Sequence, residues 1–115
     1  MEIAKSLIFY VKETNQPVVA VMSGANRMDE KKLKQLIDGK LKRADAEFVK
    51  NRTGFAIGGV PPAGHKESLQ TFVDEDLLKF SQVWSAAGNP HAVFPLKPQE
   101  LLELCSAQVV DIKVQ

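Results

Sequence analysis

Two apolar, β-prone runs open the chain, at residues 6–12 and 17–22, and residues 15–17 favour a turn between them. This pattern predicts an opening β-hairpin. The second run is apolar without a break from Val18 to Val21, as expected of a central strand that is covered on both faces.

A helix is predicted after the hairpin, from Asp29 as its N-cap to about Asp38, where Gly39 stops it. Aspartate accepts hydrogen bonds from the first amides of a helix, and glycine adopts the left-handed conformation that often ends one. The apolar positions expected to face the core have helical spacing: Leu33, Leu36 and Ile37.

Local signals predict two more short helices. One is expected to begin at Asp45, to bury Phe48 and Val49, and to end at Gly54. The other begins at Pro98, because proline suits the first position of a helix, where its missing N–H costs no hydrogen bond.

The remaining β-prone segments lie at residues 55–57, 69–73, 82–86, 91–96 and 109–114. Strands interspersed with short helices predict one α/β (α+β) domain over residues 1–115, in which short helices flank a mixed β-sheet. Four side chains of the later strands and the last helix are expected to fill the core: Phe72, Trp84, Phe94 and Cys105.

Charge is balanced along the chain, with a formal net charge of +1, so the sequence as a whole is not that of a strongly basic nucleic-acid binder. The balanced total charge does not exclude a local basic patch. The acidic run Asp74, Glu75 and Asp76 is most simply a solvated turn, in which Asp74 is also suited to cap the following segment.

The cellular compartment is suggested by what the sequence lacks. Cys105 is the only cysteine, so no intrachain disulfide can form, which suits a reducing compartment. The apolar runs are far shorter than the ~20 residues that span a bilayer, and the first residues do not resemble a signal peptide. We therefore expect a cytoplasmic domain with no membrane partner.

Several chemistries have no signature in this chain. It contains no phosphate-binding loop of the Gly-x-x-x-x-Gly-Lys type and no Gly-x-Ser-x-Gly nucleophile elbow. Two histidines and one cysteine form no zinc-binding pattern, so neither a metal nor a cofactor is expected. An enzyme with this sequence would act mainly by positioning its substrate and by electrostatic stabilisation.

Three stretches together resemble the bacterial prolyl-tRNA editing-domain family, often called the YbaK family. They are MDEKKL at 28–33, TGFAIGGVPPAGH at 53–65, and VDEDLL at 73–78 followed by WSAAGNPHAVF at 84–94. Their order and spacing agree with the family from about residue 6 to residue 110, which is nearly the whole chain.

The resemblance implies a mixed β-sheet flanked by helices and hydrolysis of the ester that joins a wrong amino acid to its tRNA. Lys31 would be the family's functional lysine, one loop would hold the aminoacyl ester, and a second segment would form another wall of the pocket. The implied substrate-binding residues are Gly58, Gly59, Val60, Pro61, Pro62, Ala63, Gly64, His65, Gly88, Asn89, Pro90 and His91.

Physical arguments support these assignments, although each one also has a simpler structural interpretation. A lysine near a helix start can hold the phosphate at the tRNA end with help from the helix dipole, although Lys31 beside Lys32 and Lys34 also fits a solvated surface. The glycines of residues 58–64 let backbone N–H groups approach a developing oxyanion, whereas the plainer reading is a tight connection.

Three side chains of the two pocket segments bear on substrate choice. His65 is better suited to a surface or capping role than to that of general base, and His91 to a contact in the pocket wall. Related loops often carry Phe or Leu where this chain has Ala63, so we expect a wider pocket that favours amino acids larger than alanine.

The first residues differ from the family's usual pattern, in which a helical segment precedes the first strand. We therefore expect part of the pocket or core cover to be absent, and self-association or a partner to cover that face. The expected function is metal-independent deacylation of mischarged tRNA. The expected partner is the acceptor end of the tRNA, and a synthetase is a further candidate partner. The alternatives are a non-catalytic module that binds tRNA, a synthetase or itself, and an esterase for small acyl compounds.

Overall fold

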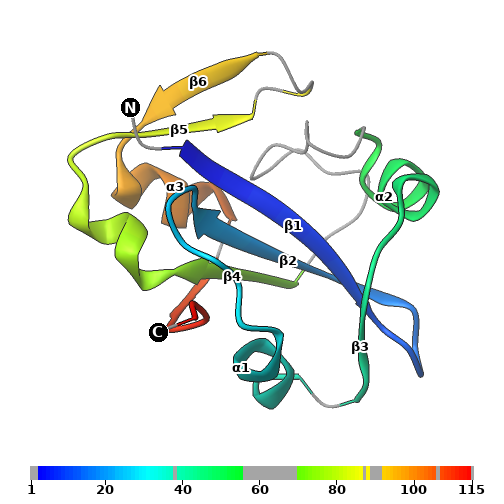
Figure 1. Cartoon of the computed structure of the whole chain (residues 1–115). Helices are drawn as coiled ribbons and strands as arrows, with labels where there is room; N and C mark the ends of the chain where they lie inside the picture. Colours follow the sequence, from blue (N-terminus) through cyan, green and yellow to red (C-terminus); the bar gives the residue numbers. More distant parts are fainter. Residues whose placement is uncertain are drawn as a thin grey trace.

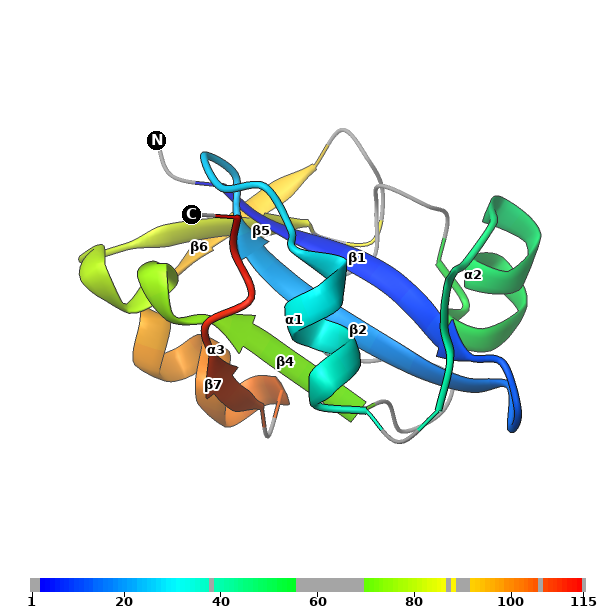
Figure 2. The ribbon, with the colours of Figure 1, turned by 60° about the horizontal axis from the view of Figure 1, so that its bottom comes forward.

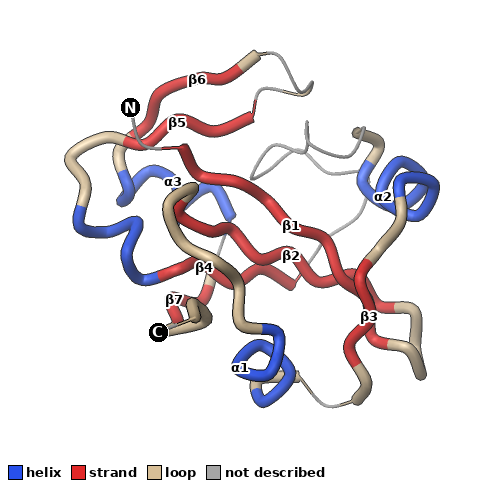
Figure 3. Tube along the Cα trace, viewed as in Figure 1, coloured by secondary structure: helices blue, strands red, loops and turns tan. Residues whose placement is uncertain are grey.

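The fold is a mixed β-sheet with short helices on both of its faces, which confirms the fold class predicted from the sequence (Figure 1; Figure 3). The computed structural model describes residues 3–37, 39–55, 70–86, 88, 92–105 and 107–114. The described elements are β1 Ile3–Val11, β2 Gln16–Ser23, α1 Glu30–Gln35, β3 Leu41–Arg43, α2 Ala46–Thr53, β4 Gln70–Asp74, the 3-10 helix η1 Glu75–Lys79, β5 Val83–Ala86, β6 Val93–Leu96, α3 Pro98–Cys105 and β7 Gln108–Val110. Within these residues the strand order is β6-β5-β1-β2-β4-β7, with β3 also paired to β1.

β1 and β2 form the predicted antiparallel hairpin, in which Leu7 pairs with Ala20. Asn15 ends the connecting turn with a φ of 58°, a left-handed conformation that asparagine tolerates better than most residues. β2 lies between β1 and β4 and is buried from Pro17 to Ser23. This burial confirms that the apolar run belongs to a central strand covered on both faces.

Side chains alternate between the two faces of the sheet, and each face carries its own core. On one side, which we call the α2/α3 face, Val49 of α2 and Leu101 of α3 join a single buried cluster. On the other side, the α1 face, Leu33 of α1 packs in a cluster with Phe9 and Phe72. Figure 2 shows α1 lying across β1 and β2.

The helix α2 begins and ends as its local sequence predicts. The Asp45 side chain accepts a hydrogen bond from the amide of Phe48 at 2.8 Å, as an N-cap does. Gly54 ends the helix with a φ of 86°, and its N–H donates to the carbonyl of Lys50. Val49 is fully buried and Phe48 packs partly buried against the same core cluster.

The helix α1 begins after Asp29, as predicted, but the prediction that it continues to about Asp38 is wrong. Its last α-helical residue is Gln35. The amides of Leu36 and Ile37 donate to the carbonyls of Leu33 and Lys34, three residues earlier, so the chain tightens into a turn and leaves the helix.

The end of the chain differs from the predicted final strand over residues 109–114. β7 stops at Val110, and the following residues leave the sheet edge to pair with the chain just before α1. The amide of Asp29 donates to the carbonyl of Ile112, and the amide of Val114 donates to the carbonyl of Arg27, each at 2.8 Å. Ile112 is fully buried on the α1 face.

The predicted core aromatics differ in their burial. Phe72 is buried at the centre of the α1 face, whereas Phe94 is half-buried against the α2/α3 core. Trp84 is only half-buried on β5. Cys105 belongs to the last helix as expected, but its side chain lies outside the described part of the chain.

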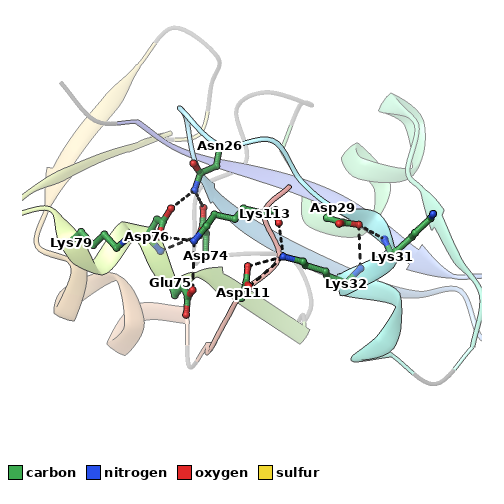
Figure 4. Close-up of polar contacts among 10 residues, drawn as sticks. All are labelled: Asn26, Asp29, Lys31, Lys32, Asp74, Glu75, Asp76, Lys79, Asp111 and Lys113. Atoms are coloured by element: carbon green, nitrogen blue, oxygen red, sulfur yellow. Dashed lines mark hydrogen bonds and ion pairs between the residues drawn. The ribbon is translucent and has the colours of Figure 1, made fainter. Parts of the chain in front are cut away.

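A polar network joins the ends of β2 and β4, and Figure 4 shows its members. The carboxylate of Asp74 is fully buried and accepts hydrogen bonds from the Ser23 amide at 3.1 Å, the Asn26 side chain at 2.8 Å and the Asp76 amide at 3.0 Å. The interpretation of residues 74–76 as a solvated turn is therefore wrong for Asp74, whereas Glu75 is exposed as expected. The capping role of Asp74 is confirmed. β2 and β4 are parallel, so their carboxyl ends meet here.

The network extends from Asp76 to the chain end and to α1 (Figure 4). The ammonium of Lys113 lies 2.9 Å from Asp76, which also accepts from Asn26 at 2.9 Å and pairs with Lys79. The ammonium of Lys32, on α1, donates to the carbonyl of Lys113 at 2.9 Å. One chain of polar contacts therefore fixes β2, β4, the terminal segment and α1 relative to one another.

Removal of the Asp74 carboxylate is expected to destabilise the fold. In Asp74→Ala, the buried amide of Ser23 and the half-buried side chain of Asn26 lose this acceptor, which costs about 2–3 kcal/mol of unfolding free energy. Urea unfolding at neutral pH measures the loss. Glu103→Ala, an exposed change on α3, is the control, and equal stability of the two variants would contradict the structural role of Asp74.

The stability should also depend on pH through Asp76. Hydrogen bonds from Lys113, and then from Asn26 and Lys79, hold the pKa of the Asp76 carboxyl well below its usual range. The unfolded chain takes up this proton at about pH 3.9, so the contribution is present above that pH and is lost as the pH falls towards the folded pKa.

We therefore expect wild-type protein to lose more unfolding free energy between pH 7 and pH 3 than Asp76→Asn does. Urea unfolding at several pH values in this range gives the two slopes, and Glu103→Gln should retain the wild-type slope. Parallel curves for wild type and Asp76→Asn would show that Asp76 does not couple stability to pH.

Candidate active site

Lys31 lies in the first turn of α1 with an exposed side chain. The amides of Lys31 and Lys32 both donate to the Asp29 side chain, at 3.0 and 3.4 Å. The helix start therefore already uses these two amides for its own cap. Figure 4 shows the Lys31 side chain extending away from Asp111 and Lys113, so it stands apart from the polar network.

A cavity of about 270 Å³ opens on the α1 face beside this helix. Three of its lining residues alternate along β1 and so share one face of the strand: Lys5, Leu7 and Phe9. The rest come from the segment before and into α1 and from β3: Arg27, Met28, Glu30 and Arg43. Lys31 itself is not among the lining residues.

The cavity joins a positive rim to an apolar floor. Lys5, Arg27 and Arg43 contribute cations, against the single carboxylate of Glu30. Phe9 is buried, and Leu7 and Met28 pack half-buried against the same cluster. A site of this kind suits a ligand with a phosphate or carboxylate and an apolar part.

The backbone holds the rim of the cavity in place. Arg43 is opposite Phe9 in the pairing of β3 with β1. Met28 forms a bridge with Lys113, next to the hydrogen bond that Arg27 accepts from Val114. Lys5, Arg27 and Arg43 were not predicted from the sequence, because they lie in three separate segments that only the fold brings together.

On the opposite face, Phe55 and Gly88 lie side by side. A Cβ atom built on Gly88, whose φ is 102°, would stand 3.5 Å from the Phe55 ring. Phe55 is held by its amide, which donates to the Thr53 hydroxyl at 3.1 Å. Gly88 is one of the predicted substrate-binding residues, and Phe55 precedes the predicted pocket residue Gly58 by three positions in the sequence.

Most of the predicted pocket residues lie outside the described residues. They are Gly58, Gly59, Val60, Pro61, Pro62, Ala63, Gly64, His65, Asn89, Pro90 and His91, together with the β-prone residues 56 and 57. Their assignment to substrate binding stays a prediction.

Two features of the described residues bear on other classes of function. No group of three or more His, Cys, Asp or Glu side chains in that part of the chain could hold a metal ion. Within the same residues, no helix is long and apolar enough to cross a membrane.

Known proteins are similar to this chain over nearly its full length. The model of the aminoacyl-tRNA editing domain matches residues 1–104. The uncharacterised protein YwhH of Bacillus subtilis is 34% identical over 93% of this chain and 68% of its own. EbsC of Enterococcus faecalis, named as a proposed Cys-tRNA(Pro)/Cys-tRNA(Cys) deacylase, is 31% identical over 96% of this chain and 67% of its own.

A solved structure agrees with the fold. It is the crystal structure of a proposed trans-editing enzyme for prolyl-tRNA synthetase, with a TM-score of 0.93 and 46% sequence identity. The match covers 98% of this chain and 71% of the other. The family model, the sequence relatives and this structure agree with one another, and the chain belongs to the aminoacyl-tRNA editing domain family.

Proposed function

We propose that this chain hydrolyses the ester that joins a wrong amino acid to its tRNA. Membership in the editing-domain family supports this, as does the name of the Enterococcus relative, which assigns deacylation of Cys-tRNA to that protein. The observation that carries the proposal furthest is the cavity on the α1 face, whose cations are suited to the phosphates of a tRNA acceptor end.

The cavity offers both parts of a nucleotide a suitable partner. Arginine binds phosphate oxygens in a bidentate manner and lysine binds them as a point charge, which fits Arg27, Arg43 and Lys5. The apolar floor of Leu7 and Met28 suits a sugar or base face. Phosphate contacts of this kind position a nucleic acid without reading its sequence.

Hydrolysis requires that water attack the ester carbonyl carbon and that the bond to the ribose oxygen then break, with the ribose oxygen taking up a proton. We propose that a neighbouring ribose hydroxyl of the substrate activates this water. Backbone amides of residues 58–64 would stabilise the developing oxyanion, a contribution that typically reaches ~3–4 kcal/mol for one donor.

Lys31 stays a second candidate for a phosphate contact, outside the lining of the cavity. It follows Glu30, which does line the cavity, and its side chain is exposed. We further propose that the reaction needs no metal, because the sequence contains no cluster of residues with the spacing of a zinc or magnesium site. Binding to a synthetase and self-association are further proposals about partners.

The first expected result is deacylation that a chelator does not reduce. A panel of tRNAs charged with different amino acids, folded with magnesium beforehand, is incubated with the protein with and without excess chelator. Release of the amino acid should be equal in both. Complete loss that zinc restores would overturn the metal-free mechanism, and tight tRNA binding without turnover on any substrate would favour a non-catalytic module.

The second expected result distinguishes phosphate binding by the cavity residues from phosphate binding by Lys31. Lys5→Ala and Arg27→Ala should each lower kcat/KM about ten- to a hundred-fold, because each removes a charge-assisted contact to phosphate. Each should also reduce the slope of log affinity for tRNA against log salt by about 0.7–0.9.

Lys34→Ala, an exposed change on α1, is the matched control. Lys31→Ala should resemble the cavity variants if Lys31 contacts phosphate and the Lys34 control if it does not. Wild-type rates and slopes in both Lys5→Ala and Arg27→Ala would refute the assignment of the cavity.

A further inference from the structure

The edge of the sheet beside the cavity carries three exposed lysines, which we call the basic edge: Lys12, Lys40 and Lys42. Lys12 directly follows β1, Lys40 directly precedes β3, and Lys42 is the middle residue of β3. Figure 1 shows β3 running between α2 and α1, beside the β1–β2 hairpin. The three lysines therefore come together at one exposed end of the sheet.

The three side chains share one face of the sheet. Lys42 is opposite Tyr10 in the pairing of β3 with β1, and the amide of Lys12 donates to the carbonyl of Lys40 at 2.8 Å, which continues this register. Because side chains alternate along a strand, Lys12 lies on the side of Tyr10, and Lys40 on the side of Lys42. Lys12 and Lys40 are thus like charges placed opposite each other, which destabilises a sheet. Like charges gathered at a cost to the fold are typical of a surface that meets a partner of opposite charge.

The nearest carboxylate does not neutralise these lysines by ion pairing. Both oxygens of Glu13 accept from the backbone amide of Lys40, at 3.0 Å each, so this side chain fixes the backbone of the segment. Within the described residues, no ion pair joins a carboxylate to the ammonium groups of Lys12, Lys40 or Lys42. The basic edge therefore presents its positive charge to solvent.

The basic edge continues the positive rim of the cavity. Arg43, which lines the cavity, follows Lys42 on β3 and is likewise exposed. On the other side of the edge, the ring of Phe48 stacks on Tyr10, with their centres 4.8 Å apart. The guanidinium of Arg52 lies 5.2 Å from the centre of the Phe48 ring and adds a further positive charge. One positive surface thus runs from the cavity around the sheet edge to α2, which suits a polyanion better than a single phosphate.

We propose that the basic edge binds backbone phosphates of the tRNA acceptor stem while the aminoacylated end of the same tRNA lies at the cavity. This inference rests on the deacylase function proposed above. Lysine binds phosphate as a point charge, and such contacts position a nucleic acid without reading its sequence. The basic edge therefore raises the affinity for the duplex and leaves the choice of amino acid to the pocket. Lysines at an exposed strand also prevent pairing with a second chain, and the experiment separates the two roles.

The test compares two substrates that carry the same amino acid ester: a charged tRNA and an aminoacylated trinucleotide that has no duplex. In the double variant Lys40→Ala, Lys42→Ala, the KM for the charged tRNA should rise about ten-fold at an unchanged kcat. The kcat/KM on the trinucleotide should keep its wild-type value. The slope of log affinity for uncharged tRNA against log salt should fall by about 1.4–1.8, as expected for two lost phosphate contacts.

Two control variants accompany the double alanine variant. Lys40→Arg, Lys42→Arg retains both charges and should retain the KM and the salt slope. Lys97→Ala removes an exposed lysine at the start of α3, which lies away from β3 in Figure 1, and should behave as wild type on both substrates. All variants should melt at the wild-type temperature within about 2 °C, because the changes are exposed.

The other outcomes separate this inference from the function on which it rests. An equal loss on both substrates would overturn it, because the lysines would then act at the ester and not on the stem. Wild-type affinity and slope for tRNA, with aggregation of the double variant, would show that the lysines only protect the edge. If wild type hydrolyses neither substrate, the deacylase function fails, and unchanged binding of uncharged tRNA by the double variant would overturn the basic edge separately.

Discussion

The buried carboxylate of Asp74 is the contact on which the geometry of the α1 face depends. It binds the last residue of β2 and the side chain of Asn26, and so fixes where the chain leaves the sheet. The next two residues, Arg27 and Met28, are then held by the terminal segment, whose Lys113 is paired with Asp76. These contacts hold the irregular segment that forms the cavity rim in a fixed position. Residues on a strand are held in this way by the sheet itself.

Strand β1 contributes side chains to both faces of the sheet. Lys5 and Ser6 are consecutive on β1, so pleating sends the lysine to the cavity of the α1 face and the serine to the core of the α2/α3 face.

Elements whose ends are set by neighbouring residues were predictable from the sequence. Contacts between residues far apart in the sequence were not. Asp45 and Gly54 mark the ends of α2 because a cap and a left-handed glycine act within a few residues. Asp74 is different, since its partner Ser23 stands 51 positions earlier and nothing around residues 74–76 reveals the burial. The cavity cations come from three separate segments, so only the pairing of β3 with β1 and the closing contacts of the terminal segment bring them together.

The contact between the terminal segment and α1 also concerns the growing chain on the ribosome. Lys32 and its acceptor Lys113 are 81 positions apart. At roughly 5–20 residues per second, translation needs on the order of 4–16 s to supply that partner after Lys32 has been made. During this interval the residues before α1 lack the terminal segment that holds them, so the rim of the basic cavity cannot yet take its folded geometry.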